Sequence, residues 1–212
     1  MPKARHGKLL FRDVETIVPN HPNLVLRVAT DNDIYLIEEF CNKCKELGFL
    51  NNQNLKNIKW DWIRSVGKYY IGIDLELNKI FTMAGYHPLL EIDNHSWRIL
   101  FRGAQLPGYA LRAFSKNQLR TSVHFAHVLY YQINDILTRD PEAKLYMSTN
   151  IIDNTDAPKS ARLNRSTAPI LEAQGLITLE VKDVELYYTR QNLWRINIDE
   201  YMRQRSVIYL GS

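Results

Sequence analysis

Two stretches of the chain contain basic side chains and no acidic ones. No Asp or Glu lies between Asp93 and Asp135, or from Ala157 to Leu171. Their basic and imidazole side chains are those of His95, Arg98, Arg102, Arg112, Lys116, Arg120, His124 and His127 in the first, and Lys159, Arg162 and Arg165 in the second. Each stretch leads into a predicted helix, and the free N–H groups at a helix start favour anions. The sequence therefore predicts a site for an anionic ligand such as a phosphate group.

Three ionisable residues follow a predicted central strand and are possible general bases. They are His87, Glu91 and Asp93. A base must accept a proton from the reacting group, and carboxylates and imidazoles do this in most enzymes. The alternative is that the two carboxylates are solvated loop residues and that the histidine is partly buried. Spacing alone leaves both interpretations open.

Two pairs of residues have spacings that are also found in metal or redox sites. Cys41 and Cys44 lie late in a predicted amphipathic helix and on its apolar side, whereas a reactive thiolate is favoured at a helix N-terminus. We therefore expect the cysteines to pack in the core. His124 and His127 would need a third metal ligand, and the nearest carboxylate, Asp135, is two turns away. We predict no metal site.

Bulk properties place the chain among ordinary globular proteins. It has 212 residues, of which 45% are hydrophobic and 24% charged, enough for one domain with a sizeable core. No run of residues is long and apolar enough for a membrane span, no signal peptide is visible, and two cysteines fit a reducing interior. We expect a cytoplasmic protein that does not enter a membrane. The net charge of +4 permits nucleic acid, but no recognition motif supports it, and we do not expect it as a partner.

The first half of the chain is predicted to contain two helices and four strands. Residues 1–23 read as a basic extension. A strand at 24–29 is followed by a helix with Thr30 as its N-cap and Gly48 at its end. Residues 51–64 form a second helical candidate. Residues 69–77 alternate between apolar and polar side chains, which predicts a half-buried strand, and 80–86 and 97–104 continue as a meander.

The second half begins with the strongest helical pattern, residues 116–138. A strand near Tyr146, a helix over 161–173 ended by Gly175, and a closing hairpin over 184–199 follow. A strand reached through a long helix predicts a parallel crossover. We expect an α/β or α+β domain over 24–199, with a mixed, mostly antiparallel sheet of about seven strands and about four helices. In the tail, 200–212, the apolar run 207–210 is strand-like and suits pairing with a sheet edge of its own chain or of a neighbour; the second alternative predicts a homo-oligomer.

This order of elements resembles the GNAT superfamily of N-acetyltransferases. Two phrases carry the resemblance, LRVATDND at 26–33 and LEAQGLI at 171–177. The family ends its acetyltransferase core with an apolar residue, Tyr, Glu, two variable residues and Gly-Phe. Here Glu172 and Gly175 match that ending, while Leu171 replaces the tyrosine. The resemblance implies acetyl-CoA as cofactor and an amine, on a small molecule or peptide, as acceptor.

The resemblance also implies where the cofactor binds. The family cradles its pyrophosphate in a glycine-rich loop, and no register between Gln105 and Ser122 reproduces that loop. The residues expected at the cofactor are the strand end Ala104, Gln105 and Leu106, the arginines Arg112, Arg120 and Arg162, and the hydroxyls of Thr121 and Ser122. The family's usual acid is the tyrosine that Leu171 replaces, so Tyr187, Tyr188 or Ser166 would have to take its place. Glu91 is the candidate base and Tyr188 the candidate acid.

Two functions remain open from the sequence. One is a divergent acetyl-CoA-dependent N-acyltransferase, favoured by the positive charge at the expected phosphate position. The other is a non-catalytic GNAT-fold binding or assembly module, favoured by the missing glycine loop and the missing tyrosine.

Overall fold

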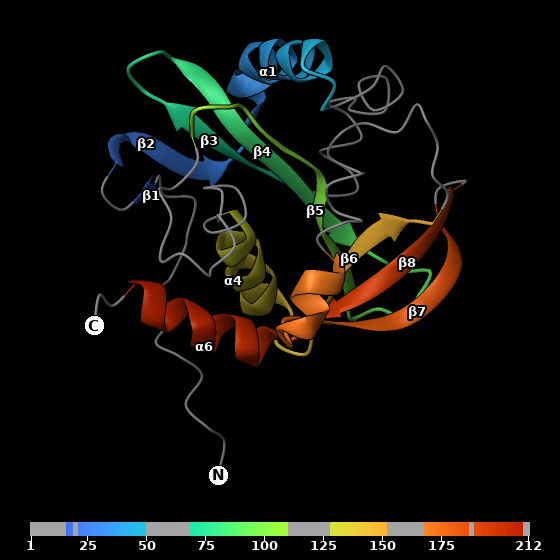
Figure 1. Ribbon diagram of the computed structural model, residues 1–212. Helices are drawn as coiled ribbons and strands as arrows, with labels where there is room; N and C mark the ends of the chain where they lie inside the picture. Colours follow the sequence, from blue (N-terminus) through green and yellow to red (C-terminus); the bar gives the residue numbers. More distant parts are fainter. Residues whose placement is uncertain are drawn as a thin grey trace.

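A mixed sheet of eight strands forms the centre of the molecule (Figure 1). The computed structural model describes residues 16–18, 21–49, 68–109, 128–151, 168–186 and 189–209. The strand order is β1-β2-β3-β4-β5-β6-β8-β7. The strands are β1 Thr16–Val18, β2 His21–Val28, β3 Lys68–Asp74, β4 Lys79–Pro88, β5 Ser96–Gln105, β6 Lys144–Asn150, β7 Ile177–Leu186 and β8 Thr189–Ile196.

One parallel contact divides this otherwise antiparallel sheet. Among the described strands, only β5 and β6 pair in parallel, and the chain between them contains helix α4, Leu129–Arg139. A parallel pair requires such a crossover because the chain must return to the same end of the sheet. The predicted crossover is therefore confirmed, as is the mostly antiparallel mixed fold. The sheet has eight strands where about seven were expected.

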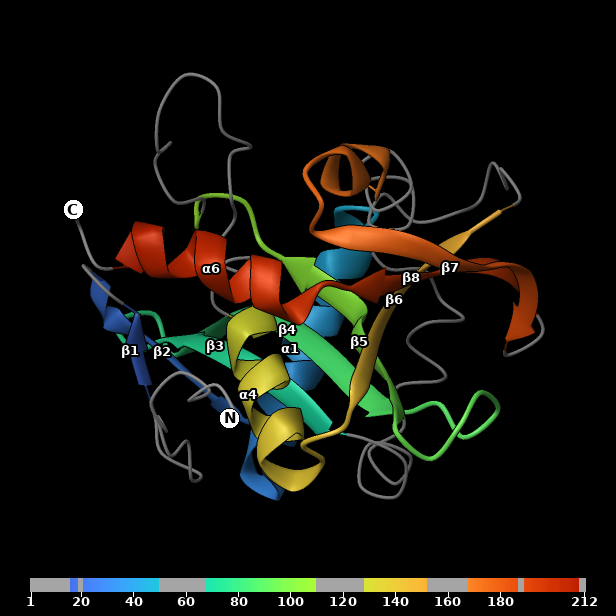
Figure 2. The same ribbon diagram turned by 90° about the horizontal axis from the view of Figure 1, so that it is seen from below.

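Helices cover both faces of the sheet, with a separate core beneath each. Helix α1, Ile34–Glu46, lies on one face, while α4 and α6, Ile198–Tyr209, lie on the other (Figures 1 and 2). The first core joins α1 to β2, β3 and β4. The second joins α4, the helical turn at 168–173 and the first part of α6 to the opposite side of the strands. The expected helix after Thr30 is confirmed as α1, and α4 and the helical turn at 168–173 are the described parts of the helices expected over 116–138 and 161–173. The helix expected over 51–64 lies outside the described residues, and α6 was not expected as a helix.

The start of α1 is fixed by a buried carboxylate. Asp33 lies in the 3-10 turn η1, Asp31–Asp33, and accepts hydrogen bonds from the backbone N–H and hydroxyl of Thr30 at 2.7 and 2.9 Å. Arg27 of β2 binds both oxygens of the same carboxylate at 2.6 Å. Although burial opposes ionisation, these donors lower the pKa of Asp33 below its usual value. The predicted cap at Thr30 is confirmed.

The strand predicted over 69–77 is wrong at its C-terminal end and in its burial. β3 stops at Asp74, whose side chain accepts the N–H groups of Glu76 and Leu77 at 3.1 Å and turns the chain. Leu75 and Leu77 are therefore exposed in the turn instead of facing the core. From Tyr69 onward β3 is buried on both faces, because helices cover both sides of the central strands.

Both ends of the chain differ from expectation. Strand β1 and the first residues of β2 lie within 1–23, which the sequence suggested was an extension. The prediction of a strand-like tail is wrong, because helix α6 runs through 207–209. Tyr201 in the first part of α6 is buried in the core. Oligomerisation through the tail stays a prediction, but strand pairing is no longer its basis. Among the described residues, no helix is long and apolar enough to cross a membrane.

The predicted end of the helix before β7 is confirmed. Gly175 has a φ of +72°, and its N–H bonds to the carbonyl of Glu172 at 2.9 Å. The N–H of Leu176 bonds to the carbonyl of Leu171 at 3.0 Å. This is the pattern of a helix closed by a left-handed residue, and glycine adopts that conformation at little cost.

Candidate functional site

The parallel strands β5 and β6 separate soon after they begin. They pair through three positions only, Ser96 with Lys144, Trp97 with Leu145 and Arg98 with Tyr146. Beyond them β5 pairs with β4 and β6 pairs with β8, while β5 and β6 run apart (Figure 2). We call the opening between residues 99–105 of β5 and 147–150 of β6 the fork. Unpaired strand edges can bind an extended ligand through main-chain hydrogen bonds.

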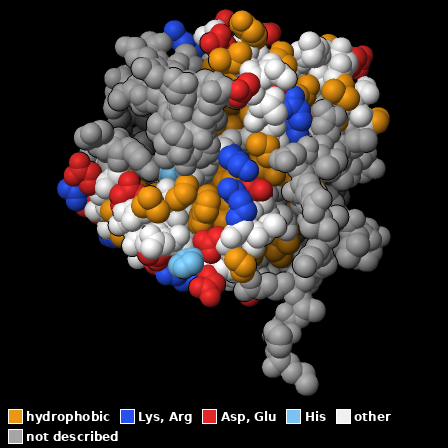
Figure 3. Space-filling model, turned by 180° about the vertical axis from the view of Figure 1, so that it is seen from behind, with side chains coloured by type: hydrophobic (Ala, Val, Ile, Leu, Met, Phe, Trp, Pro, Cys, Tyr) orange, Lys and Arg blue, Asp and Glu red, His pale blue; other side chains and the backbone are white. Residues whose placement is uncertain are grey.

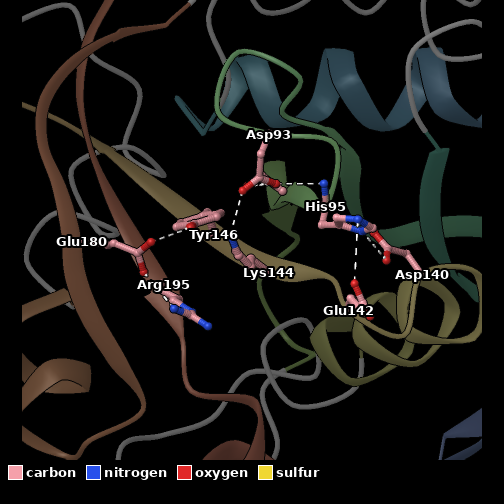
Figure 4. Close-up of polar contacts among 9 residues, drawn as sticks. Asp93, His95, Asp140, Glu142, Lys144, Tyr146, Glu180 and Arg195 are labelled. Atoms are coloured by element: carbon pink, nitrogen blue, oxygen red, sulfur yellow. Dashed lines mark hydrogen bonds and ion pairs between the residues drawn. The ribbon is translucent and has the colours of Figure 1, made fainter.

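The closed end of the fork is held by a carboxylate in the turn before β5. Asp93 binds the ammonium group of Lys144 at 2.8 Å, the hydroxyl of Ser96 at 2.9 Å and the N–H of His95 at 2.8 Å (Figure 4). The hydrogen bond from Lys144 is the main reason that the pKa of Asp93 is lowered to about 2, and the hydrogen bond from Ser96 adds to this effect. The backbone N–H of Lys144 also bonds to the carbonyl of His95 at 2.7 Å. These contacts join the first residues of β6 to the turn that starts β5.

A second carboxylate ties the same turn to the end of α4. Asp140 accepts the indole N–H of Trp97 at 3.0 Å and contacts Nδ1 of His95 at 2.9 Å. Glu142 lies 3.9 Å from Nε2 of the same imidazole (Figure 4). The nearby carboxylates raise the pKa of His95, and Asp140 has the largest effect. The point at which the two strands meet is therefore braced from two sides.

Tyr146 extends this bracing across three strands. Its hydroxyl donates to Glu180 of β7 at 2.7 Å, and Arg195 of β8 binds the other oxygen of Glu180 at 3.3 Å (Figure 4). Burial and the bond to Glu180 raise the pKa of Tyr146 to about 12. A buried tyrosine bonded to a carboxylate suits a structural brace. The sequence shows Tyr146 only as part of an apolar run, and no spacing links it to Glu180.

The open side of β5 has an irregular backbone. Leu100 and Arg102 have φ angles of +54° and +52°, which are unusual for residues with side chains, and the pairing with β4 shifts register here. Gln132 of α4 is fully buried and supports this irregularity. Its amide oxygen accepts the N–H of Leu100 at 3.1 Å, and its NH₂ group donates to the carbonyl of Ala84 at 2.8 Å. One α4 side chain thus satisfies backbone groups of both β4 and β5.

Polar side chains lie beside the fork on the α1 side of the sheet. His87 of β4 is the cross-strand partner of Arg98, and the side chain of Arg98 binds the amide oxygen of Gln191 at 3.1 Å. Burial, helped by the charges of Arg98 and Arg102, lowers the pKa of His87 to about 4. His87 is therefore neutral at pH 7. Burial also raises the pKa of Tyr69 to about 12, although Arg102 opposes that shift.

The described candidates for cofactor binding cluster at the end of β5. Ala104 and Leu106 are buried against the α1 core, and Gln105 is half-buried, with its side-chain amide donating to the carbonyl of Tyr109 at 3.2 Å. The backbone N–H of Leu106 donates to the backbone carbonyl of Phe81 at 2.8 Å. The other predicted cofactor and acid residues lie outside the described residues: Arg112, Arg120, Thr121, Ser122, Arg162, Ser166, Tyr187 and Tyr188. His124 and His127 also lie there.

The candidate bases lie in different surroundings. Glu91 is exposed in the turn at the closed end of the fork. Asp93 lies in the same turn, where its carboxylate binds the ammonium group of Lys144 of β6. His87 is only 1% exposed, so it is more deeply buried than the partly buried histidine considered from the sequence. Leu171, at the position of the family's tyrosine, is 2% exposed and packs in the core beneath α4 and α6.

The two cysteines lie in the α1 core, as expected. Cys41 and Cys44 are both buried and unbonded to each other. Burial raises the pKa of each thiol to about 12. Such thiols are poor nucleophiles and poor metal ligands at neutral pH, because both roles need the thiolate.

Elsewhere on the described surface, charges of both signs are mixed. Exposed ion pairs join Lys43 to Glu46, Arg190 to Asp183 and Arg203 to Glu200. The face seen from behind carries basic, acidic and hydrophobic side chains side by side (Figure 3).

Comparisons with solved structures identify the fold. No family model matches the chain, and no curated protein matches it. A ribosomal-protein-S5-alanine acetyltransferase from Vibrio fischeri superposes with a TM-score of 0.55 and 13% identity, over 88% of this chain and 98% of that one. An uncharacterized protein from Bacillus halodurans gives a TM-score of 0.51 at 10% identity, over 87% and 89% of the two chains. Together with the crossover and the eight-stranded order, the likeness shows that this chain has the GNAT fold.

Proposed function

We propose that the protein is an N-acyltransferase that transfers an acetyl group from acetyl-CoA to an amine, with the cofactor bound in the fork. The observation that carries this proposal is the early separation of β5 and β6 after only three paired positions. An acetyltransferase with the same fold supports the choice of reaction. The cofactor supplies an activated acetyl thioester.

The fork fits the extended part of this cofactor. The pantetheine arm of coenzyme A is a narrow chain with two amide groups, which can pair with an open strand edge as a peptide does. The edges of β5 and β6 that face each other are not joined by strand pairing beyond Arg98 and Tyr146 in the described part of the chain. The residues proposed for the phosphates are Arg112, Arg120, Thr121, Ser122 and Arg162.

The hydrogen bonds and ion pairs around the fork would fix β5 and β6 at its closed end and leave the two strands apart at its open end. The Asp93–Lys144 and Tyr146–Glu180 contacts hold the closed end. Gln132 of α4 holds the irregular part of β5 by hydrogen bonds from the α4 side of the sheet. A site formed by fixed backbone groups loses little conformational entropy when a ligand binds. The chain itself would therefore bind and orient the thioester.

The alternative function is a GNAT-fold module that binds a ligand or partner without catalysis. The specific observation in its favour is Leu171, which packs in the core where the family has a tyrosine. A leucine cannot protonate a leaving thiolate. Turnover in this protein would need another acid, for which Tyr188 remains the candidate.

Thermal unfolding with acetyl-CoA tests the proposal. Ligand binding to the folded state stabilises it by RT ln(1 + [L]/Kd), which is about 2.7 kcal/mol at one hundred times Kd. We expect the melting temperature to rise in a saturable manner with acetyl-CoA. Arg120→Gln should reduce the rise, and Lys182→Gln, which removes an exposed charge on β7, should leave it unchanged. No rise at millimolar acetyl-CoA would contradict the proposal. Binding of acetyl-CoA without acetyl transfer to any tested amine would favour the non-catalytic module.

A further inference from the structure

The open edge of β5 ends in a turn that reverses the chain. After β5 the sequence reads Leu106-Pro107-Gly108-Tyr109, and the backbone N–H of Leu106 still pairs with β4 through the carbonyl of Phe81. Gly108 has a φ of +95°. A Pro-Gly pair is typical of a type II turn, because proline suits its second position and the third position needs a positive φ. The turn directs Tyr109 back onto β4.

Tyr109 uses its ring, its hydroxyl and its carbonyl in separate contacts. The ring stacks on Phe81 of β4, with centroids 4.5 Å apart and planes at 18°, and the ammonium group of Lys79 lies 5.9 Å from its centroid. The hydroxyl donates to Oδ2 of Asp74, the last residue of β3, at 2.6 Å. The carbonyl accepts the side-chain amide of Gln105, the last residue of β5, at 3.2 Å. One residue therefore joins the end of β5 to β3 and β4.

The acceptor of the Tyr109 hydrogen bond is itself held in place. Asp74 is buried, and its other oxygen, Oδ1, accepts the backbone N–H groups of Glu76 and Leu77 at 3.1 Å. Although burial opposes ionisation, the Tyr109 hydroxyl and these N–H groups keep the pKa of Asp74 below its usual value. Hydrogen bonds to charged groups are stronger than those between neutral groups. The bond from Tyr109 therefore ends on a fixed and charged carboxylate.

The irregular part of β5 lies between two supports. Its backbone has left-handed φ angles at Leu100 and Arg102, and its pairing with β4 shifts register in the same region. Gln132 of α4 binds the N–H of Leu100 at the near side of this irregularity. The bond between Tyr109 and Asp74 secures the chain beyond its far side. The edge of β5 proposed to bind the cofactor is therefore fixed at both ends by side chains from outside it.

We propose that Tyr109 is a positioning residue for acetyl-CoA. By binding Asp74 it fixes the end of β5 and keeps the backbone groups of 99–105 in the geometry needed to pair with the cofactor. A binding edge that is fixed in advance loses less conformational entropy on binding, which raises affinity. The Tyr109 hydroxyl acts through the strand and not on the acetyl group. This inference rests on the proposed function, because it requires the cofactor to bind in the fork.

The first test removes the hydrogen bond and keeps the ring. Tyr109→Phe can still stack on Phe81 but cannot donate to Asp74. Calorimetric titration with acetyl-CoA should give a Kd that is roughly three- to tenfold higher in this variant, the range expected for one hydrogen bond. Tyr35→Phe is the matched control, since it removes a hydroxyl from a side chain of α1 that is 80% exposed, and its Kd should equal that of the wild type. An unchanged Kd in Tyr109→Phe would overturn the inference.

The second test asks whether Tyr109 acts through Asp74. Asp74→Asn removes the negative charge and keeps an oxygen for the N–H groups of Glu76 and Leu77. If the two residues act through their bond, their effects on the Kd of acetyl-CoA are not additive. Tyr109→Phe should therefore raise Kd less in the Asp74→Asn background than in the wild type. The same increase in both backgrounds would overturn the role assigned to this bond.

The third test separates positioning from a purely structural role. Amide hydrogen exchange is compared in the wild type and Tyr109→Phe, each saturated with acetyl-CoA. We expect the cofactor to slow exchange within 99–105 less in the variant than in the wild type, and within 147–150 of β6 equally in both. Equal slowing of both segments in the two proteins would overturn this inference and leave the proposed function intact. No slowing of either segment in the wild type would instead overturn the proposed function, and the role of Tyr109 with it.

Discussion

Arg98 of β5 and Tyr146 of β6 are the last residues through which the two parallel strands pair. On the closed side of this pair, ion pairs and hydrogen bonds join the strands and the neighbouring turn. On the open side, within the residues that the structure describes, each strand pairs only with its other neighbour. The proposed cofactor site begins at this pair. The contacts that hold it therefore provide direct tests of the account.

Gln132 should be important for stability. In Gln132→Leu, the N–H of Leu100 and the carbonyl of Ala84 lose their partner in a buried place. Each unsatisfied buried polar group costs about 1–3 kcal/mol, so we expect a loss of about 2–4 kcal/mol in the free energy of unfolding, measured by urea denaturation. Thr138→Val removes an exposed bond to Asn134 from the same helix and should change it by about 0.5 kcal/mol or less. Equal effects of the two substitutions would show that Gln132 does not bridge the strands.

Asp93 should make stability depend on acidic pH. Its pKa is about 2 in the folded protein, below the roughly 3.9 of an unfolded chain. Its contribution is therefore complete above about pH 4 and is lost as the pH falls toward about 2. The wild type should be more stable than Asp93→Asn at pH 6, with the difference shrinking between about pH 4 and pH 2. Glu91→Gln removes a carboxylate from the same turn as a control. A difference that does not vary with pH would contradict the role of the Asp93–Lys144 pair.

His95 should have the opposite pH dependence. Asp140 and then Glu142 raise its pKa above the roughly 6.5 of an unfolded chain. The stabilisation from its positive charge is complete below about pH 6.5 and is lost as the pH rises through the higher folded value. Unfolding free energies at pH 6 and pH 9 should show His95→Gln less stable than the wild type at pH 6, with a smaller difference at pH 9. The same difference at both values would exclude a charged contact with Asp140.

The cysteines should react slowly in the folded protein. With pKa values of about 12, roughly one thiol in ten thousand is ionised at pH 8. A chromogenic disulfide reagent should therefore label Cys41 and Cys44 far more slowly in native buffer than in concentrated urea. Fast stoichiometric labelling of the native protein would instead support a redox or metal role for the pair.

Periodicity predicted the elements that local patterns control. The helix after Thr30, the meander before α4, the crossover to β6 and the glycine that ends the helix before β7 all follow from residues close in sequence. The errors have two causes: a local turn contact that the alternation of apolar residues did not reveal, and a long-range core contact that overrides the local pattern. Asp74 ends β3 by accepting two N–H groups of the turn, and the run 207–209 continues a helix that is anchored by buried Tyr201. The alternation of β3 could not reveal that helices would cover both its faces.

The site was only partly accessible from the sequence. The acid-free stretch indicated Arg98 and Arg102, but His87 was considered as a base and not as their neighbour. Its place opposite Arg98 depends on the register of two strands, and a one-residue change of register would move it to the other face. The Tyr146–Glu180 bond joins residues 34 apart. Such contacts leave no periodic signal in one sequence.

Amide hydrogen exchange with and without acetyl-CoA tests the central claim most directly. If the cofactor pairs with the open strand edges, exchange should slow within 99–105 of β5 and 147–150 of β6. Exchange within β7, at the far edge of the sheet, should stay the same apart from any global stabilisation. No protection at saturating acetyl-CoA, or protection confined to segments away from β5 and β6, would contradict the account.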